Sequence, residues 1–197
     1  MEYNDDYKNY QLNRGWLRKN AKKIYINNTL KYVKGKSIDF GCGIGELLTE
    51  LPEGSVGFEI NKAAVEYCNK KKLNVKLYNP DIDDYKLNNL NTGEFKTMII
   101  SHVLEHLENA HEIIRQIMKT CNRLSIERVI IIVPCIKGFN FDLTHKTFVD
   151  ISFLKKLEYD LKDNYNILIA KYFPLNFLCI GKYFTYNELF VVLEKII

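Results

Sequence analysis

Short apolar runs alternate with helix-like stretches between residues 37 and 133, and this alternation restricts the possible folds more than any other feature of the sequence. Strands that alternate with helices form a parallel sheet, because each parallel connection needs a long crossover. Strands that are apolar throughout are typical of sheets covered by helices on both faces. The expected class is therefore α/β, and the expected strands are Ser37–Phe40, Val56–Phe58, Val75–Leu77, Met98–Ile100 and Val129–Val133.

The remaining segments divide into helices, one long loop and a final pair of strands. An amphipathic helix is expected from Trp16 to just before Gly35, and the other expected helices are Gly45–Leu51, Lys62–Lys71, Leu107–Cys121 and Asp150–Leu161. Cys135–Val149 is predicted to be a loop, and loops of that length are commonly functional. Asn166–Phe173 and Thr185–Leu193 are rich in β-forming residues and are expected to pair antiparallel at the sheet edge.

Composition supports a single globular domain over residues 1–197, with residues 1–34 as an N-terminal helical cover. The chain is 47% apolar, which suffices for a sizeable core, and no linker or repeat divides it. The longest apolar run of note, Val129–Val133, falls far short of the roughly 18 residues of a membrane span. The five scattered cysteines and the N-terminal residues, which do not resemble a secretory signal, favour a cytoplasmic location. No C-x-x-C pair or H-E-x-x-H spacing occurs, so no metal site is predicted.

Basic residues are concentrated near the N-terminus. Residues 7–36 contain nine lysines and arginines and no acidic residue, although the net charge of the whole chain is only +4. Such a segment could attract an acceptor that carries phosphate, or a nucleic acid. Lysines on a solvated helix surface explain the same pattern, and we favour this second interpretation.

Glycines at alternate positions follow the first expected strand, in the sequence Asp39-Phe-Gly41-Cys42-Gly43-Ile-Gly45. Glycines between a strand and a helix let a nucleotide-like ligand approach the bare backbone. A dinucleotide motif needs another glycine at position 46, but Glu46 stands there and would oppose a pyrophosphate. The carboxylate of Asp39 suits a positively charged ligand group instead.

Two further acidic residues stand where the next strands end. Glu59 closes the second strand, and its carboxylate could accept hydrogen bonds from both hydroxyl groups of a ribose. Asp81 follows the third strand, and it could accept from the amine of an adenine ring. We expect Ile60 and Ile82 to supply apolar faces for that ring in the same crevice. Together these residues predict a nucleoside site that includes a cationic group.

The glycine-rich motif, Glu59, Asp81 and the sequence Ser-His-Val-Leu-Glu-His-Leu at 101–107 resemble the class I S-adenosylmethionine (SAM)-dependent methyltransferases over about Lys36–Val149. The similarity is greatest to the small-molecule methyltransferases. The resemblance implies a Rossmann-like, seven-stranded sheet with an antiparallel last strand, and SAM as cofactor. It also implies that Tyr10, Arg14 or Trp16 meets the carboxylate of the cofactor. The cofactor-binding residues that it implies are Asp39, Gly41, Cys42, Gly43, Gly45, Glu59, Ile60, Asp81, Ile82, Ser101 and His102.

We expect the methyl group to pass to an oxygen of a small-molecule acceptor, such as a sugar, a phenol or quinone-like compound or another metabolite, which could be anionic or glycosylated. A hydroxyl acceptor benefits from a general base, and His145, oriented by Asp142, is one candidate. His145 could instead serve only a structural role, and His102 is the rival base. The acceptor is expected among the N-terminal helix, Cys135–Val149 and the aromatic turn that contains Phe177, Tyr183 and Phe184. A SAM-binding regulator without catalysis and an RNA methyltransferase are the alternative functions; no membrane partner is expected.

Overall fold

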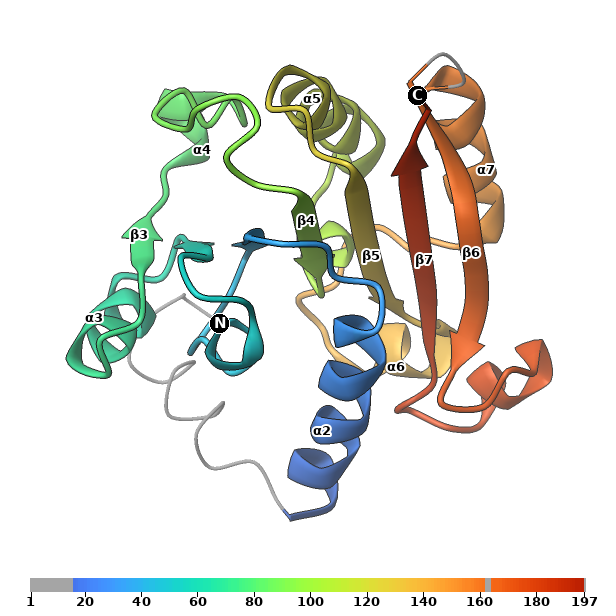
Figure 1. Ribbon diagram of the computed structural model, residues 1–197. Coiled ribbons are helices and arrows are strands. Elements are labelled where there is room, and N and C mark those ends of the chain that lie inside the picture. The colour runs from blue at the N-terminus through green and yellow to red at the C-terminus, as the bar shows by residue number, and fades with distance from the viewer. Residues whose placement is uncertain (1–15, 162–163, 197) are drawn as a thin grey trace.

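Figure 1 shows a computed structural model of the chain, in which a seven-stranded sheet is covered by helices. The structure describes residues 16–161 and 164–196, and it describes the side chains of these residues except at 16–21, 178 and 179. None of the helices in these ranges is long and apolar enough to cross a membrane. The helices are α2 (Trp16–Leu30), η1 (Leu48–Glu50), α3 (Lys62–Lys70), α4 (Pro80–Asp83), η2 (Leu104–His106), α5 (Ala110–Arg123), α6 (Ile136–Phe141), α7 (Ile151–Asp160) and η3 (Leu178–Lys182). The strands are β1 (Ser37–Phe40), β2 (Val56–Glu59), β3 (Val75–Leu77), β4 (Thr97–Ser101), β5 (Arg128–Pro134), β6 (Tyr165–Phe173) and β7 (Glu188–Lys195).

The strand order is β3-β2-β1-β4-β5-β7-β6. All neighbouring pairs from β3 to β5 are parallel, whereas β7 runs antiparallel to both β5 and β6. This confirms the expected α/β class and the antiparallel last strand. The two final strands pair as predicted, but only β6 lies at the edge, because β7 is inserted between β5 and β6.

The sheet has a buried core on each face, which explains why its strands are apolar throughout. Met98 and Ile100 of β4 belong to the core that also contains buried residues of α5 and α7. Ile99, between them in sequence, belongs to the opposite core, which contains residues of η1 and α3. Successive side chains of a strand point to opposite faces, so one apolar run supplies both cores.

Two expected segments differ from the structure. Gly45–Leu51 was predicted to be a helix, but it contains only the short turn η1, because Gly45 has a φ of +75° and Pro52 follows directly. The predicted loop Cys135–Val149 contains the helix α6. Gly138 lets α6 pack closely against the turn before β7, since a Cβ atom there would come within 2.7 Å of the carbonyl oxygen of Thr185.

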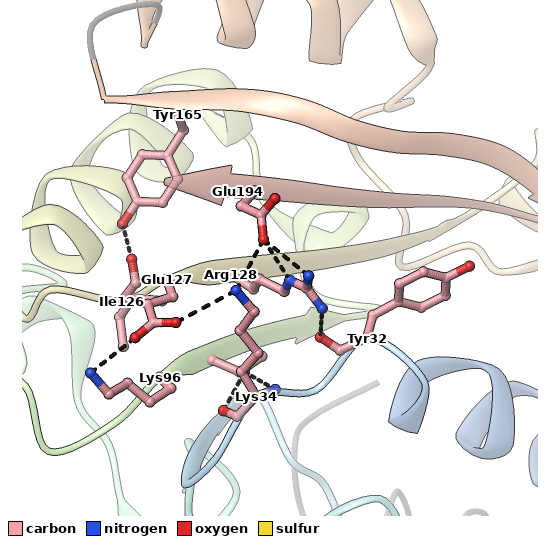
Figure 2. Close-up of polar contacts among 9 residues, drawn as sticks. Tyr32, Lys34, Lys96, Ile126, Glu127, Arg128, Tyr165 and Glu194 are labelled. Carbon is pink, nitrogen blue, oxygen red and sulfur yellow. Dashed lines mark hydrogen bonds and ion pairs between the residues drawn. The ribbon is translucent and has the colours of Figure 1, made fainter. Parts of the chain in front are cut away.

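An ion-pair network holds the segment after α2 against the sheet (Figure 2). The guanidinium of Arg128 lies 3.0 Å from Glu194 and donates a hydrogen bond to the carbonyl oxygen of Tyr32. Lys34 pairs with Glu194 at 3.1 Å and with Glu127 at 3.6 Å. These contacts join β5 and β7 to the exit of α2. They also show that Lys34, in the basic segment, is engaged within the protein rather than only solvated.

Candidate cofactor and acceptor site

An open cavity lies where β1, β2 and β4 end. Its lining includes Gly41 and Gly43 after β1, Glu59 at the end of β2, and His102 and His106 after β4. The strand order reverses direction between β1 and β4, and ligands of open α/β sheets bind at the carboxyl ends of strands at such a switch point. In Figure 1, the strands β4, β5 and β6 end on the side of the sheet where α2 and α6 lie.

The glycine loop is shaped by contacts within the protein. Gly41 has a φ of +77°, and a Cβ atom there would come within 2.4 Å of the Val103 side chain. A Cβ atom at Gly45 would come within 2.6 Å of Leu73. Gly41 and Gly43 line the cavity, whereas Gly45 does not. Glycine at position 41 therefore permits the close approach of the segment after β4, in addition to leaving room for a ligand.

Asp39 is buried at the end of β1, and its Oδ2 atom has no hydrogen-bond partner among the described residues. Burial raises the pKa of this carboxyl to about 7, and the charge of Glu59 adds to the rise, while Lys22 opposes it. A buried carboxylate that lacks a partner favours either a proton or a cationic ligand group. Asp39 thus fits the positively charged group that the sequence predicted, although it lies behind the cavity lining rather than in it.

Glu59 is buried and its carboxylate is fixed by two backbone donors. Oε2 accepts from the N–H of Gly43 at 2.7 Å, and Oε1 accepts from the N–H of Asn61 at 2.8 Å. Burial raises the pKa of Glu59, and these backbone hydrogen bonds oppose the rise. Each carboxylate oxygen has a second lone pair, and Glu59 lines the cavity, so it can accept hydroxyl groups from a ligand.

Aromatic side chains form much of the remaining wall, and sequence reasoning missed them. Phe40, Phe58, Tyr78 and Tyr85 line the cavity, and Tyr78 contacts the other three rings edge-on or tilted. The only sequence signal for this aromatic wall was Tyr78, which directly follows β3. Their arrangement can cover an apolar, planar ring.

The residues expected around an adenine ring are only partly brought together. Ile60 lines the cavity, but Ile82 is 82% exposed and Asp81 is exposed, and neither belongs to the lining. Both lie in α4, whose N-terminus is set by Asn79, because its side chain accepts from the N–H of Asp81 at 3.0 Å. The structure therefore does not place Ile82 opposite Ile60 in one crevice.

His102 lies between two buried carboxylates. Its Nδ1 is 3.1 Å from Glu105, and its Nε2 is 3.0 Å from Glu188 at the start of β7. Burial disfavours the charged imidazole, but Glu188 and Glu105 outweigh it and raise the pKa of His102 to about 10. His102 also has a φ of +56°, an uncommon conformation for a residue with a side chain. This pairing favours the protonated imidazole, and the role of general base that the sequence suggested for His102 stays a prediction.

The second candidate base, His145, is oriented differently from the prediction. Its Nδ1 lies 2.9 Å from the carbonyl oxygen of Phe139, whereas Asp142 is 4.0 Å from its Nε2. Asp142 instead accepts from the N–H and the hydroxyl of Thr144. His145 does not line the cavity, but its ring centroid is 4.7 Å from that of His106, which does. Phe139 thus orients His145, because its carbonyl is the closer partner.

The other predicted residues lie as follows. Ser101 and Cys42 are half-buried and do not belong to the cavity lining. Tyr10, Arg14 and the side chain of Trp16 fall outside the described residues. In the aromatic turn between β6 and β7, Phe177, Tyr183 and Phe184 are all exposed.

Comparisons with known proteins agree with this geometry. The sequence model of a family described as "Methyltransferase domain" matches residues 33–171. No curated protein matches the chain. A SAM dependent methyltransferase from Archaeoglobus fulgidus has a similar structure, with a TM-score of 0.64 at 20% identity, and the match covers 92% of this chain and 100% of the other.

Two further solved structures are similar at comparable levels. The PH0226 protein from Pyrococcus horikoshii OT3 has a TM-score of 0.62 at 15% identity, over 98% of this chain and 95% of its own. Magnesium protoporphyrin IX methyltransferase from Synechocystis PCC 6803, solved with bound SAM, has a TM-score of 0.60 at 14% identity, over 90% and 79% of the two chains. At these identities the similarity shows a common fold.

Proposed function

This chain belongs to the methyltransferase-domain family and is a class I SAM-dependent methyltransferase, and from that premise we propose that it methylates an oxygen atom of a small-molecule acceptor. When bound, SAM supplies a methyl group on a positively charged sulfur, and methyl transfer leaves S-adenosylhomocysteine and one proton. The observation that carries the proposal is the cavity at the switch point, with Glu59 in its lining and, outside the lining, a buried oxygen (Oδ2) of Asp39 that has no hydrogen-bond partner among the described residues.

The residues present fit the cofactor on two independent grounds. The orphaned, buried carboxylate oxygen of Asp39 needs a positive partner, and the SAM ammonium group is one. The carboxylate of Glu59, held by Gly43 and Asn61, accepts the ribose hydroxyl groups, and the aromatic wall with Ile60 covers the adenine ring. We propose these roles for Asp39, Glu59 and Ile60. The role predicted for Asp81, which is to accept a hydrogen bond from the adenine amine, requires a ligand that extends beyond the residues that line the cavity.

Residues 1–34 are proposed to cover the bound cofactor as part of a single domain. The described part of α2 supports this, because Lys22 forms an ion pair with Glu46, directly after the glycine loop. Its charge also acts on Asp39 and on Glu188. The described cysteines, Cys42, Cys68, Cys121 and Cys135, are free, which supports the cytoplasmic location that we propose.

The acceptor side of the cavity supports an oxygen acceptor. His106 lines the cavity, and His145 lies behind it, with Nδ1 bonded to a carbonyl and Nε2 directed away from that bond. A hydroxyl group must lose its proton when it is methylated, so basic groups near the acceptor favour this chemistry. The protein's further contribution is to align the acceptor with the methyl group and to keep water out with the aromatic wall.

Transfer of isotope-labelled methyl groups tests the proposal. The purified chain is incubated with methyl-labelled SAM and a small-molecule fraction of a cell extract, and the labelled products are analysed by mass spectrometry and NMR. We expect the label in a methyl ether or ester, with no label from a Glu59→Ala control that fails to bind S-adenosylhomocysteine. Label on nitrogen or carbon would contradict the oxygen assignment. Tight cofactor binding with no labelled product from any fraction would favour a regulator.

A further inference from the structure

We propose that Glu105, His106 and His145 form a binding site for a divalent transition-metal ion beside the cofactor cavity. Each of the three residues offers one ligand atom, and these atoms all lie within 4.8 Å of one another. Two imidazoles and one carboxylate are a donor set that divalent iron, cobalt, manganese and zinc accept, and three protein ligands leave coordination positions open. Such a site was not expected from the sequence, because its ligands come from two distant segments.

The hydrogen bonds of the two histidines indicate which ring nitrogen each can offer to an ion. Nδ1 of His145 donates to the carbonyl oxygen of Phe139, so the lone pair of the neutral ring lies on Nε2, 4.0 Å from Asp142. Nδ1 of His106 is 3.1 Å from the hydroxyl of Thr144, which donates to Asp142 and therefore accepts from His106. The lone pair of the neutral His106 ring is thus also on Nε2. A histidine that binds a metal typically donates its other ring N–H to such a carbonyl or carboxylate-linked partner.

Glu105 supplies the second, independent observation. This residue is fully buried; Oε1 is bonded to His102, but Oε2 has no hydrogen-bond partner among the described residues. A buried carboxylate oxygen without a partner is costly unless a cation or a proton satisfies it. The neighbouring histidines provide the remaining ligands for a cation at that position.

The two segments that carry the ligands are fixed to each other by hydrogen bonds. The N–H groups of Lys146 and Thr147 both donate to the carbonyl oxygen of Glu105, at 2.7 and 3.1 Å. The hydroxyl of Thr147 donates to the carbonyl oxygens of Leu107 and Glu108. Because these bonds hold residues 144–147 against η2, the ligands are oriented before any ion binds.

The position of the site suggests what the ion does, and this part of the argument rests on the proposed oxygen methylation. His106 also lines the cavity, so the open coordination positions lie next to the acceptor space. A hydroxyl acceptor that binds there has its pKa lowered and releases its proton to water. Its oxygen lone pair then forms the new C–O bond as the C–S bond of the cofactor breaks, and the sulfur keeps that electron pair. The substrate class is a small molecule with a hydroxyl group that can ligate a metal.

Binding of Co²⁺ to the untagged, EDTA-treated chain tests the site without any acceptor. Absorption bands in the visible range report coordination, and we expect a single Co²⁺ per chain. His145→Asn, outside the cavity lining, should weaken Co²⁺ binding by more than about 100-fold, and Thr144→Val by about 10- to 100-fold through the loss of support for His106. His111→Asn is the matched control, since His111 lies outside the cluster and its Nε2 is 3.6 Å from Asp160.

Binding of S-adenosylhomocysteine to the same samples separates the possible failures. Variants that keep this binding are folded, so their loss of Co²⁺ reports on the metal site itself. A wild-type chain that binds S-adenosylhomocysteine but no Co²⁺, or a His145→Asn variant that binds Co²⁺ as tightly as wild type, would overturn the metal site and leave the proposed methyl transfer intact. Failure to bind S-adenosylhomocysteine would instead count against the proposed function.

Discussion

Replacement of Asp39 by asparagine should stabilise the fold and weaken cofactor binding. The pKa of the buried carboxyl rises from 3.8 to about 7. Above pH 7, the ionised Asp39 therefore destabilises the folded state by about 4 kcal/mol. Between these two values the folded chain binds more protons than the unfolded chain. The free energy of unfolding of the wild type therefore falls as the pH rises through this window. Asparagine does not ionise and removes this contribution.

Urea denaturation at pH 5 and pH 8 measures the effect. Other buried acids, among them Glu59 and Glu188, also have a raised pKa, so only the difference between wild type and Asp39→Asn isolates Asp39. We expect the stability of the variant relative to wild type to increase by about 2 to 3 kcal/mol from pH 5 to pH 8. Equal differences at the two pH values would refute the reasoning.

The same variant should bind S-adenosylhomocysteine more weakly. A hydrogen bond between charged groups contributes about 1.5 to 3 kcal/mol, so the dissociation constant should rise by about 10- to 100-fold at pH 8. In the wild type the affinity should decrease as the pH falls from 8 to 6, because Asp39 becomes protonated. This pH dependence should disappear in the variant, and its persistence would show that another group is responsible.

Two further substitutions test packing, each with a matched control and each measured by urea denaturation. Gly41→Ala should cost about 1 to 3 kcal/mol more than Gly93→Ala, because both positions have positive φ but only at Gly41 does a Cβ atom meet a side chain, that of Val103. Equal costs would refute the contact. Tyr165→Phe should cost about 1 to 2 kcal/mol, since the buried hydroxyl donates at 2.7 Å to a buried carbonyl oxygen (Figure 2). Tyr183→Phe, at an exposed position, should cost nothing measurable, and equal losses at both tyrosines would contradict the prediction.

The parallel part of the sheet could be predicted closely from the sequence. Ser37–Phe40 and Val75–Leu77 form strands with the predicted bounds, because short apolar runs between helices have few alternatives. The region Gly45–Leu51 was predicted wrongly as a helix, because the positive φ of Gly45 and the position of Leu73, which a Cβ atom at residue 45 would approach to 2.6 Å, are not visible in the local sequence. The short helix α6 was missed as well, within a segment that was predicted to be a loop.

Local patterns predicted that Asp39 and Glu59 lie on neighbouring strands, but they could not predict the partners of His102. Asp39 and Glu59 end neighbouring strands, so topology alone brings them together. Glu188 reaches His102 from the last strand, and no local spacing predicts that contact. The pairing with Glu188 raises the pKa of His102, and that effect could not be predicted from the sequence around His102.

Calorimetric titration of the full chain with S-adenosylhomocysteine and, separately, with NAD tests the central claim most directly. The glycine loop, the buried carboxylates of Asp39 and Glu59 and the aromatic wall predict saturable heat with S-adenosylhomocysteine at one site per chain, and no heat with NAD. Heat with NAD and none with S-adenosylhomocysteine would contradict the assignment of this cavity to the methyl donor.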